Sequence, residues 1–522
     1  MADYLSARLL SQVSEFVAER MGFHFPRERW ADLEQGIRCI AREFEFSDTE
    51  SCVQWLFSSA VTQGQIEILA SYLTVGETYF FREKQSFRVL EERVLRELIR
   101  TRRGADQRMR IWSAGCCTGE EPYSIAILLK QMLADLRDWQ ITILATDINP
   151  QFLKKAADGI YSEWSFRGVS PEIKERYFLK KNSSRFEIPR DIKSMVTFSY
   201  LNLAEDTYPS LLNNTNAMDV IFCRNVLMYF APERARRVIQ KFHRSLLDGG
   251  WLIVSPSETS HLLYAEFVTV NFPGVTFYRK ESHRAGVTLC HGSEQETKPT
   301  ELLTLSFSFA PSAGAEPANA EPPKKPLPPD APEDDGVEPA RDPYSEAVDL
   351  YGQGRYEEAA QALSALLART GVDSKAMALL ARVYANQGKL TEALQWCERA
   401  IAADKLSPTG HLLHATILQE KGSIQDAVSA LRRALYLDPN LALAHFALGN
   451  VARQQGRLTE ASKHFENARM LLGANPKEQI LPESEGMTAG RLVEIIRATN
   501  SDQISAGSRQ QGAQKQRLRT WQ

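Results

Sequence analysis

The chain has 522 residues, too many for a single hydrophobic core, and a formal net charge of −3 at pH 7. That near-neutral total argues against a general nucleic-acid-binding protein, which usually carries a strong basic excess. The seven cysteines are odd in number and scattered without ligand spacing, which argues against a disulfide framework or a metal site and favours a reducing compartment.

The beginning of the chain does not resemble a targeting segment. The stretch MADYLSARLLSQVSEF contains acidic and polar residues where a signal peptide needs a continuous apolar run. No part of the sequence reaches the roughly 18 apolar residues that a membrane-spanning helix requires. We therefore expect a cytoplasmic protein that does not insert into a membrane.

Residues 1–80 form the first predicted unit, a small all-helical domain. Apolar residues recur there at helical spacing in two places, at Val13, Phe16 and Val17 and again at Trp30, Leu33 and Ile37. Residues 81–283 change character, because apolar runs of strand length alternate with helical stretches such as 120–136 and 232–247. That alternation is typical of a doubly wound α/β sheet.

The first strand of this region leads into a glycine-containing loop and then a helix. Gly115 and Gly119 let the backbone approach a ligand at the helix N-terminus, and Pro122 stands in the first turn where proline is favoured. The complete GxGxxG pattern is absent, and Glu120 and Glu121 would repel phosphates. The acidic loop instead suits a ligand with a ribose, an adenine and a positive charge, such as a sulfonium cofactor, although the loop alone leaves other cofactors open.

Polar residues also follow the later strands. Asp147 can accept hydrogen bonds from both ribose hydroxyls, or it can equally serve as an N-cap for the next helix. Asn202 and Asn225 each carry a donor and an acceptor, as adenine or an amino-acid group requires, but asparagine also serves turns. Polar residues at several strand ends of one sheet fit a ligand crevice at its carboxyl edge.

The rest of the chain divides into three parts. Residues 284–342 are predicted to be a disordered linker, since ten of the 24 prolines lie between Pro311 and Pro343. Residues 343–476 repeat every 34 positions, which is the tetratricopeptide (TPR) period and predicts an all-α solenoid with a concave peptide-binding surface. Residues 477–522 are expected to be a mostly disordered tail with one capping helix over 487–499. The repeat is marked by two series, Gly354, Gly388, Gly422 and Gly456, and Ala359, Ala393, Ala427 and Ala461.

Four strings resemble a known family. They are Glu77-Thr-Tyr-Phe-Phe-Arg-Glu, Ser113-Ala-Gly-Cys-Cys-Thr-Gly-Glu-Glu-Pro-Tyr-Ser, Ala145-Thr-Asp-Ile and Phe222-Cys-Arg-Asn-Val-Leu-Met-Tyr-Phe. In order and spacing they resemble the chemotaxis receptor methyltransferases, the CheR family, over about residues 1–283. The resemblance implies an N-terminal helical domain packed on a Rossmann-like domain that binds S-adenosyl-L-methionine.

The resemblance also implies site residues. The cofactor contacts that it implies come from Thr78, Arg82, Glu121, Asp147, Asn202, Leu203, Asn225 and Val226. It places Arg82 and Tyr229 beside the reacting methyl group, as catalytic residues. Gly76 stands where several relatives have asparagine, so a side-chain contact is lost there.

Two further departures from the family concern a loop and a short segment. Cys116 and Cys117 replace small residues and are expected to fill a tight loop, since the neighbouring Glu120 and Glu121 disfavour a low thiol pKa. The segment between Phe178 and Val196 is short compared with relatives that grip a receptor's C-terminal peptide. We therefore expect an enzyme that does not need that peptide.

The expected activity is methyl transfer from S-adenosylmethionine to glutamate side chains on the cytoplasmic helices of a methyl-accepting chemoreceptor. An ionised glutamate needs no general base, because its reference pKa is about 4.3. The TPR array is expected to dock an unknown protein or peptide and, through the linker, to raise the enzyme's local concentration. The alternative is a TPR scaffold whose methyltransferase domain binds cofactor without turnover. The intact set of Arg82, Glu121, Asp147 and Asn225 weighs against it.

Overall fold

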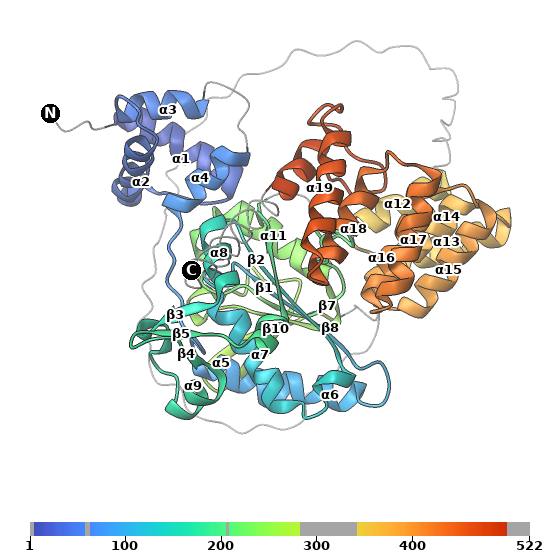
Figure 1. Cartoon of the computed structure of the whole chain (residues 1–522), viewed down its shortest axis with the longest axis horizontal. Helices are drawn as coiled ribbons and strands as arrows, with labels where there is room; N and C mark the ends of the chain where they lie inside the picture. The colour runs from blue at the N-terminus through green and yellow to red at the C-terminus, as the bar shows by residue number, and fades with distance from the viewer. Residues whose placement is uncertain (1–4, 58–62, 205–207, 282–341, 498–522) are drawn as a thin grey trace, which may run out of the picture. The chain divides into compact units, whose positions relative to one another are not determined.

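A computed structural model describes residues 5–57, 63–204, 208–281 and 342–497 (Figure 1). Within these ranges it contains a group of N-terminal helices, a mixed α/β domain and a stack of helix pairs, so the expected fold class is confirmed. The predicted linker lies almost wholly outside the described residues. None of the described helices combines the length and the apolar character needed to cross a bilayer.

The N-terminal helices pack around their own apolar core. Ser6 begins the first helix by accepting a hydrogen bond from the Leu9 backbone N–H, and Gly22, at φ 81°, ends it in the left-handed region. Val13, Val17, Leu33 and Ile37 belong to the core, as their helical spacing predicts. The elements are α1 (Ala7–Met21), η1 (Arg27–Arg29), α2 (Trp30–Glu43), α3 (Thr49–Phe57) and α4 (Gln63–Leu73).

The central sheet has seven strands in the order β6-β2-β1-β7-β8-β10-β9. The first five in this order are parallel, and β10 and β9 complete the sheet in antiparallel pairing. The strand order reverses at β1, with β2 on one side and β7 on the other, which makes a crevice at the carboxyl ends of these strands. The strands are β1 (Arg108–Ala114), β2 (Gln140–Asp147), β6 (Val196–Tyr200), β7 (Met218–Phe222), β8 (Leu246–Ile253), β9 (Val268–Phe272) and β10 (Val275–Arg279).

Both faces of the sheet are covered. Neighbouring residues on one strand alternate between two cores: Ile111 belongs to one hydrophobic cluster and Trp112 to the other. The sequence-predicted helices over 120–136 and 232–247 correspond to α7 and α11. The helices of this domain are α5 (Lys84–Val89), the π-helix η2 (Leu90–Leu95), α6 (Arg96–Arg102), α7 (Glu120–Met132), η3 (Leu136–Asp138), α8 (Pro150–Asp158), η4 (Glu163–Phe166), α9 (Pro171–Tyr177), α10 (Arg190–Lys193), η5 (Leu227–Tyr229), α11 (Pro232–Ser245) and η6 (Pro256–Glu258).

A small antiparallel sheet occupies the region of the short segment noted in the sequence. Its strands are β3 (Ile160–Ser162), β4 (Leu179–Lys180) and β5 (Arg185–Glu187), and their order in the sheet is β3-β5-β4. The ring of Phe80 packs beneath it, with centroids 5.2 Å from Phe166 and 4.7 Å from Phe178. This aromatic packing ties the small sheet to the segment that precedes α5.

Four helix pairs form the repeat array, whose helices stack side by side in Figure 1. The recurring alanines are fully buried where the helices of a pair cross, which is the role that the 34-residue interval predicts: Ala359, Ala393, Ala427 and Ala461. Each recurring glycine has a positive φ in the turn within its pair. The helices are α12 (Pro343–Gly352), α13 (Tyr356–Thr370), α14 (Ser374–Asn386), α15 (Leu390–Ala403), α16 (Pro408–Glu420), α17 (Ile424–Leu437), α18 (Ala442–Gln454) and α19 (Leu458–Leu472).

The amino edge of the central sheet contacts this array directly. Arg110, in β1, forms an ion pair with Glu420 at 3.2 Å, and both side chains are almost completely buried. Asn216, just before β7, donates to the same carboxylate at 2.8 Å. The side chain of Gln140, at the start of β2, donates to the Glu420 carbonyl at 2.6 Å. The described parts of the α/β domain and the array therefore contact each other directly.

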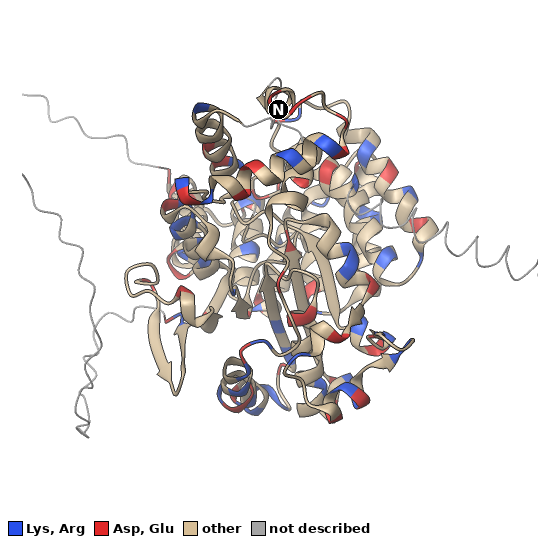
Figure 2. Cartoon of the chain, turned by 90° about the vertical axis from the view of Figure 1, so that its left-hand side faces the viewer, with Lys and Arg blue, Asp and Glu red and all other residues tan. Residues whose placement is uncertain are grey.

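The turns of the array make this contact close. The Arg108 guanidinium donates to the Gly388 carbonyl at 3.0 Å. A Cβ atom added to Gly388 would lie 3.0 Å from the Leu247 side chain, and one added to Gly422 would lie 3.2 Å from the Gln140 amide. Glycine suits these turns for two reasons: it adopts the positive φ easily, and it leaves room for the sheet to come close. Acidic and basic residues are interspersed along the helices in Figure 2. In that view they do not separate into one acidic and one basic face.

Candidate active site

A pocket lies at the carboxyl ends of β1, β2, β6 and β7, and residues of the N-terminal helical domain form part of its wall. It contains about 1110 Å³ of empty space, part of it open to solvent. The structure brings together all nine site residues that the family resemblance implies, whereas Glu120 of the acidic loop does not line the pocket and instead accepts hydrogen bonds from Thr118 and Ser165. Those lining residues are Thr78, Arg82, Glu121, Asp147, Asn202, Leu203, Asn225, Val226 and Tyr229.

The loop after β1 is held tightly beneath the pocket. The backbone N–H groups of Gly115 and Cys116 both donate to the Thr146 carbonyl, at 2.8 Å and 2.9 Å. Gly115 has φ 82°, and a Cβ atom at this position would lie 2.4 Å from the Val226 side chain. A larger residue is therefore excluded both by backbone conformation and by space, which keeps the loops after β1 and β7 in contact.

Asp147 ends β2 and is almost fully buried at the pocket. Its two carboxylate oxygens accept from the backbone N–H groups of Cys117 at 2.8 Å and Asn149 at 2.9 Å. Burial raises the pKa of Asp147 to about 6, against the opposing effect of these hydrogen bonds. Asn149, not Asp147, is the N-cap of α8. The N-cap alternative considered for Asp147 is thus wrong, and its carboxylate remains available to a ligand.

Glu121 directly contacts a pocket residue, Arg224, that sequence reasoning did not single out. Its carboxylate accepts from the Ser113 hydroxyl at 2.7 Å and from the Arg224 guanidinium at 3.1 Å. Burial raises the pKa of Glu121, although Arg224 opposes that change. Arg224 also donates to the Arg82 carbonyl at 2.6 Å and pairs with Glu83 at 2.8 Å. It therefore fixes the loop after β7 against the segment that carries Arg82.

Arg82 occupies a strained turn at the pocket. The residues on either side, Phe81 and Glu83, have φ values of 54° and 59°, in the region that favours glycine. The Arg82 guanidinium donates to the Glu77 carbonyl at 2.8 Å and lies 5.9 Å from the ring centre of Tyr79. The turn thus presents a half-buried guanidinium to the pocket on a backbone that its neighbours hold in place.

The side chain of Asn202, after β6, forms hydrogen bonds within the protein through both its nitrogen and its oxygen. Its amide nitrogen donates to the Arg20 carbonyl at 2.7 Å, and its amide oxygen accepts from the Ala204 backbone at 3.0 Å. The turn role considered for this residue is therefore observed, together with a contact to α1. A second amide hydrogen is left for a ligand, and Leu203 adds an apolar part of the lining.

Asn225 differs from Asn202 because its side-chain oxygen is not satisfied. Among the described residues, its buried Oδ1 has no hydrogen-bond partner, although Asn225 lines the pocket. Its backbone has φ 57° and is anchored by Glu258, which accepts from the N–H groups of Asn225 at 2.6 Å and Val226 at 2.8 Å. Glu258, which lies more than 30 residues later, could not have been connected with this loop from sequence spacing.

Tyr229 joins the loop after β7 to the N-terminal helical domain. Its carbonyl accepts from the His24 backbone N–H at 2.7 Å, and the Arg29 guanidinium lies 5.6 Å from its ring centre. The rings of Phe23 and Phe230 meet edge to face at 5.6 Å. The helical domain therefore closes one side of the pocket through the segment that follows α1.

The packing around Gly76 and around the pair Cys116 and Cys117 explains why these residues differ from the family. A Cβ atom on Gly76 would lie 2.6 Å from the ring of Phe152, so this chain has a phenyl ring where a side chain at position 76 would extend. Burial, with an added contribution from Asp147, raises the pKa of both Cys116 and Cys117. Neither thiol has the lowered pKa that a redox role needs, in agreement with their expected space-filling role.

The lining fits a cofactor that combines a ribose, a base and a positive charge. Asp147 offers a carboxylate suited to ribose hydroxyls, and Asn225 Oδ1 offers an unused acceptor. The lining carries the carboxylates of Glu121 and Asp147 and the guanidinium groups of Arg82 and Arg224, so it offers both signs of charge to a cofactor that has a sulfonium and a carboxylate. The donor set therefore fits S-adenosylmethionine better than a dinucleotide.

Comparisons with known proteins agree with this chemistry. Residues 76–272 match the family described as CheR methyltransferase, SAM binding domain, and residues 344–408 and 412–476 match the tetratricopeptide repeat. Chemotaxis protein methyltransferase 1 of Pseudomonas aeruginosa is 38% identical over 223 residues, which are 42% of this chain and 78% of that protein. The chemotaxis protein methyltransferase of Borreliella burgdorferi is 30% identical over 252 residues, 48% of this chain and 87% of that protein.

Among solved structures, a thermophilic TPR protein of Thermus thermophilus is 24% identical, with a TM-score of 0.23, and the match covers 25% of this chain and 72% of that one. The family match over the sheet domain identifies S-adenosylmethionine as the cofactor. The described sheet, its carboxyl-edge pocket and the similarity to the bacterial enzymes lead to one conclusion: the chain belongs to the chemotaxis protein methyltransferases and carries C-terminal TPR repeats.

Proposed function

We propose that this methyltransferase acts on glutamate side chains of methyl-accepting chemoreceptors, on their cytoplasmic helices, and that it works in the cytoplasm. The observation that carries the proposal is the position of Arg82: its half-buried guanidinium lines the pocket on a turn that Arg224 and Glu77 hold. A carboxylate substrate suits such a cation. S-adenosylmethionine supplies an electrophilic methyl group, and an ionised glutamate can take it without a general base.

The roles of the lining residues follow from their surroundings. Asp147, Glu121 and Asn225 would hold the cofactor, whereas Arg82 would position the incoming carboxylate, with Tyr229 beside the same space. Thr78, Asn202, Leu203 and Val226 complete the predicted cofactor contacts. Since the reaction brings a carboxylate and a cation together and leaves a neutral ester, catalysis would consist mainly of positioning and charge matching.

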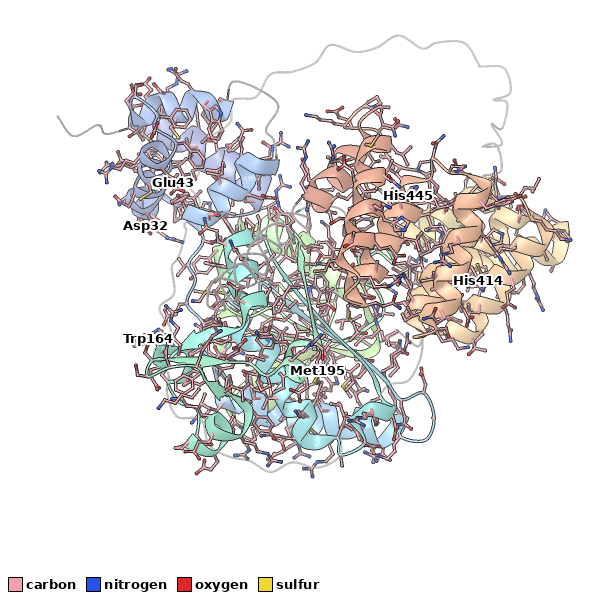
Figure 3. The ribbon with its side chains drawn as sticks, viewed as in Figure 1. Asp32, Glu43, Trp164, Met195, His414 and His445 are labelled. Atoms are coloured by element: carbon pink, nitrogen blue, oxygen red, sulfur yellow. The ribbon has the colours of Figure 1, made fainter. Side chains whose placement is uncertain are left out.

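The surface beside the pocket supports an acidic protein substrate. Trp164 lies at the periphery of the sheet domain (Figure 3) and is 68% exposed. The Arg167 guanidinium lies 4.3 Å from the Trp164 ring and 4.1 Å from the ring of Tyr79, which lines the pocket. A helix that presents glutamates could place its backbone on this aromatic surface while one carboxylate enters the pocket. Each methylation would then remove one negative charge from a receptor helix.

The array adds a second part to the proposal. Stacked helix pairs bind peptides or helices on their concave side, so we infer that the array docks a protein partner. The alternative is a scaffold whose enzyme domain binds S-adenosylmethionine without efficient turnover. The complete set of lining residues, with Arg82 and Asp147 in position, favours turnover.

The test is incubation of the chain with tritiated S-adenosylmethionine and membranes from the source cells. We expect label on a receptor-sized band that is released by alkali, because glutamyl methyl esters hydrolyse in base. Receptors whose methylation-site glutamates are changed to alanine provide the matched control and should lose the label. Alkali-stable label, or label only on small molecules, would contradict the glutamate assignment. Cofactor binding without any label would favour the scaffold.

A further inference from the structure

The part of the chain after the last repeat packs onto the array. Residues 477–497 are described, and 489–497 form a helix within the stretch 487–499 where the sequence predicts a capping helix, whereas residues 498–522 lie outside the described residues. The side chains of Leu481, Met487, Leu492 and Ile496 are buried in the same hydrophobic cluster as the repeat helices. The segment is thus bound to the array along its length.

The segment reaches the first helices of the early pairs. Helix α14 contacts both α12 and α16, so the first helices of successive pairs approach one another and line the inner face of the array. Tyr351 belongs to α12, and Arg382 and Asn386 belong to α14. The loop that contains Glu483 and Glu485 contacts these helices, although about 100 residues separate it from Arg382. It therefore crosses from the end of the array back to its beginning.

Two glutamates of this loop meet one polar cluster. Arg382 forms an ion pair with Glu483, and its guanidinium lies 3.9 Å from the Glu485 carboxylate. The Tyr351 hydroxyl donates to Glu485 at 2.6 Å. Asn386 in turn donates to the Tyr351 oxygen at 3.0 Å, which holds the hydroxyl in place. The cluster of Arg382, Tyr351 and Asn386, which we name the carboxylate clamp, therefore receives both acidic side chains.

The charge of the clamp favours an acidic occupant. Arg382 is 9% exposed, and burial lowers its pKa, but the Glu483 and Glu485 carboxylates raise it by more. Without the loop, the Arg382 guanidinium would lose both carboxylates with which it pairs here. The inner face is thus built to bind negative charge.

The loop that fills the clamp is conformationally strained. Glu483 has φ 60° and Glu485 has φ 55°, so two non-glycine residues one position apart adopt the left-handed region. Such conformations are energetically unfavourable and persist where surrounding contacts hold them. A separate acidic peptide could meet the clamp in an extended conformation without that strain.

We propose that the carboxylate clamp is a binding site for an acidic peptide of a partner protein, and that Glu483-Ser484-Glu485 occupies it in cis as a replaceable stand-in. The partner segment would carry two carboxylates spaced two residues apart. This inference rests on the docking role proposed for the array and names the chemistry of its ligand. It assigns the inner face of the array to exchange between the chain's own loop and an acidic partner.

Displacement of the loop would also reach the enzyme. The second carboxylate oxygen of Glu485 accepts from the Leu211 backbone N–H at 2.9 Å, and Leu211 belongs to the array's hydrophobic cluster. Leu211 lies between β6 and β7, the strands whose carboxyl ends line the pocket. A partner in the clamp would therefore release one direct contact between the array and the sheet domain.

The first test measures binding of a labelled peptide with the sequence of residues 479–490 to the full chain. Glu483→Gln/Glu485→Gln weakens the competing loop, so we expect this variant to bind the peptide at least about 10-fold more tightly than the unchanged chain. Adding Arg382→Gln should remove that gain, whereas Arg399→Gln, on the exposed side of α15, should not. A peptide with glutamine at both glutamate positions should not bind.

The proposal is overturned if the folded double variant, checked by circular dichroism, does not bind the peptide, since the loop would then be a permanent cap. If that variant does not fold, hydrogen exchange of the unchanged chain decides. Millimolar peptide should speed the exchange of amides 479–490, and unchanged exchange would also overturn the proposal. Receptor methylation is assayed separately with tritiated S-adenosylmethionine, so failure of the peptide test and failure of the glutamate substrate can be told apart.

Discussion

The central sheet has a buried aspartate near each of its two edges, and the two carboxylates have different hydrogen-bond partners. Asp147, at the carboxyl edge, accepts hydrogen bonds from backbone amides, and burial raises its pKa to about 6. Asp219, near the amino edge, receives two hydrogen bonds from the Arg102 guanidinium and one from the Arg110 backbone. Among the described residues, no cation pairs with Asp147 beside the pocket, whereas Arg102 neutralises Asp219 inside the protein.

This difference separates a ligand-binding edge from a structural one. At the carboxyl edge, Arg82 and Asn225 keep bonding capacity that the protein itself does not use. At the amino edge, Arg110 pairs with Glu420 and also donates to the carbonyls of Asn214 and Asn216, although Oε2 of Glu420 has no hydrogen-bond partner among the described residues. Changes at the amino edge should therefore affect stability, whereas changes at the carboxyl edge should affect cofactor binding and turnover.

The largest effect is expected for Arg110→Met. It leaves the Glu420 carboxylate buried without its cation, which typically destabilises a protein by about 3–5 kcal/mol. Urea unfolding of the full chain should show this loss. Arg110→Met/Glu420→Met should recover most of it, and Arg137→Met, at an exposed arginine, should change little. A double variant as unstable as the single one would show that the lost stability comes from the other hydrogen bonds of Arg110, to the carbonyls of Asn214 and Asn216.

Arg82→Ala, at the carboxyl edge, should reduce turnover without changing the free energy of unfolding. We expect turnover to fall by about 10–100-fold while S-adenosylmethionine affinity changes less, because Arg82 is assigned to the incoming carboxylate. Single-turnover methylation and isothermal titration separate the two effects. Arg88→Ala, at an exposed arginine of α5, is the matched control. An equal loss of cofactor affinity would assign Arg82 to the cofactor.

Glu258→Gln tests whether a residue that supports the pocket matters for binding. Its two carboxylate oxygens accept from the backbone N–H groups of Asn225 and Val226. In glutamine, an NH2 group replaces one of these oxygens and would face a backbone N–H donor. We expect S-adenosylmethionine affinity to fall by about 10-fold, as loss of a charge-assisted hydrogen bond implies. The exposed Glu266 gives the control Glu266→Gln. Unchanged affinity by isothermal titration would mean that the loop keeps its position without the carboxylate.

The smallest effect is a pH dependence of cofactor binding. Because the pKa of Asp147 is raised to about 6, the cofactor-free protein takes up a proton as the pH falls through that value. A neutral carboxyl group accepts ribose hydrogen bonds less well, so affinity should be about fourfold weaker at pH 5.5 than at pH 7.5. Asp147→Asn should bind more weakly at pH 7.5 and lose this step. If the step persists in Asp147→Asn, Glu121, whose pKa is also raised, is the titrating group.

Much of the pocket could be predicted from local sequence. Gly115, Asp147 and Asn225 follow strand ends, and parallel strands bring their carboxyl ends to one edge, so the residues converge. Other parts could not be predicted. Arg224 lies within one of the strings that resemble the family, but nothing in the sequence marks it as a site residue. Its hydrogen bonds to the Glu121 carboxylate and the Arg82 carbonyl depend on how distant loops fold together. The N-cap alternative for Asp147 failed because a second suitable residue, Asn149, lies two positions later.

The sequence by itself determined the order of the parts, the sheet class and the 34-residue repeat, because periodicity and turn residues act over short distances along the chain. It did not determine what the repeat turns touch. Only the tertiary structure decided that Glu420 neutralises Arg110 and that Glu483 and Glu485 fill the clamp. Charges separated by 100 residues or more leave no periodic signal, since their pairing depends on the packing of whole domains.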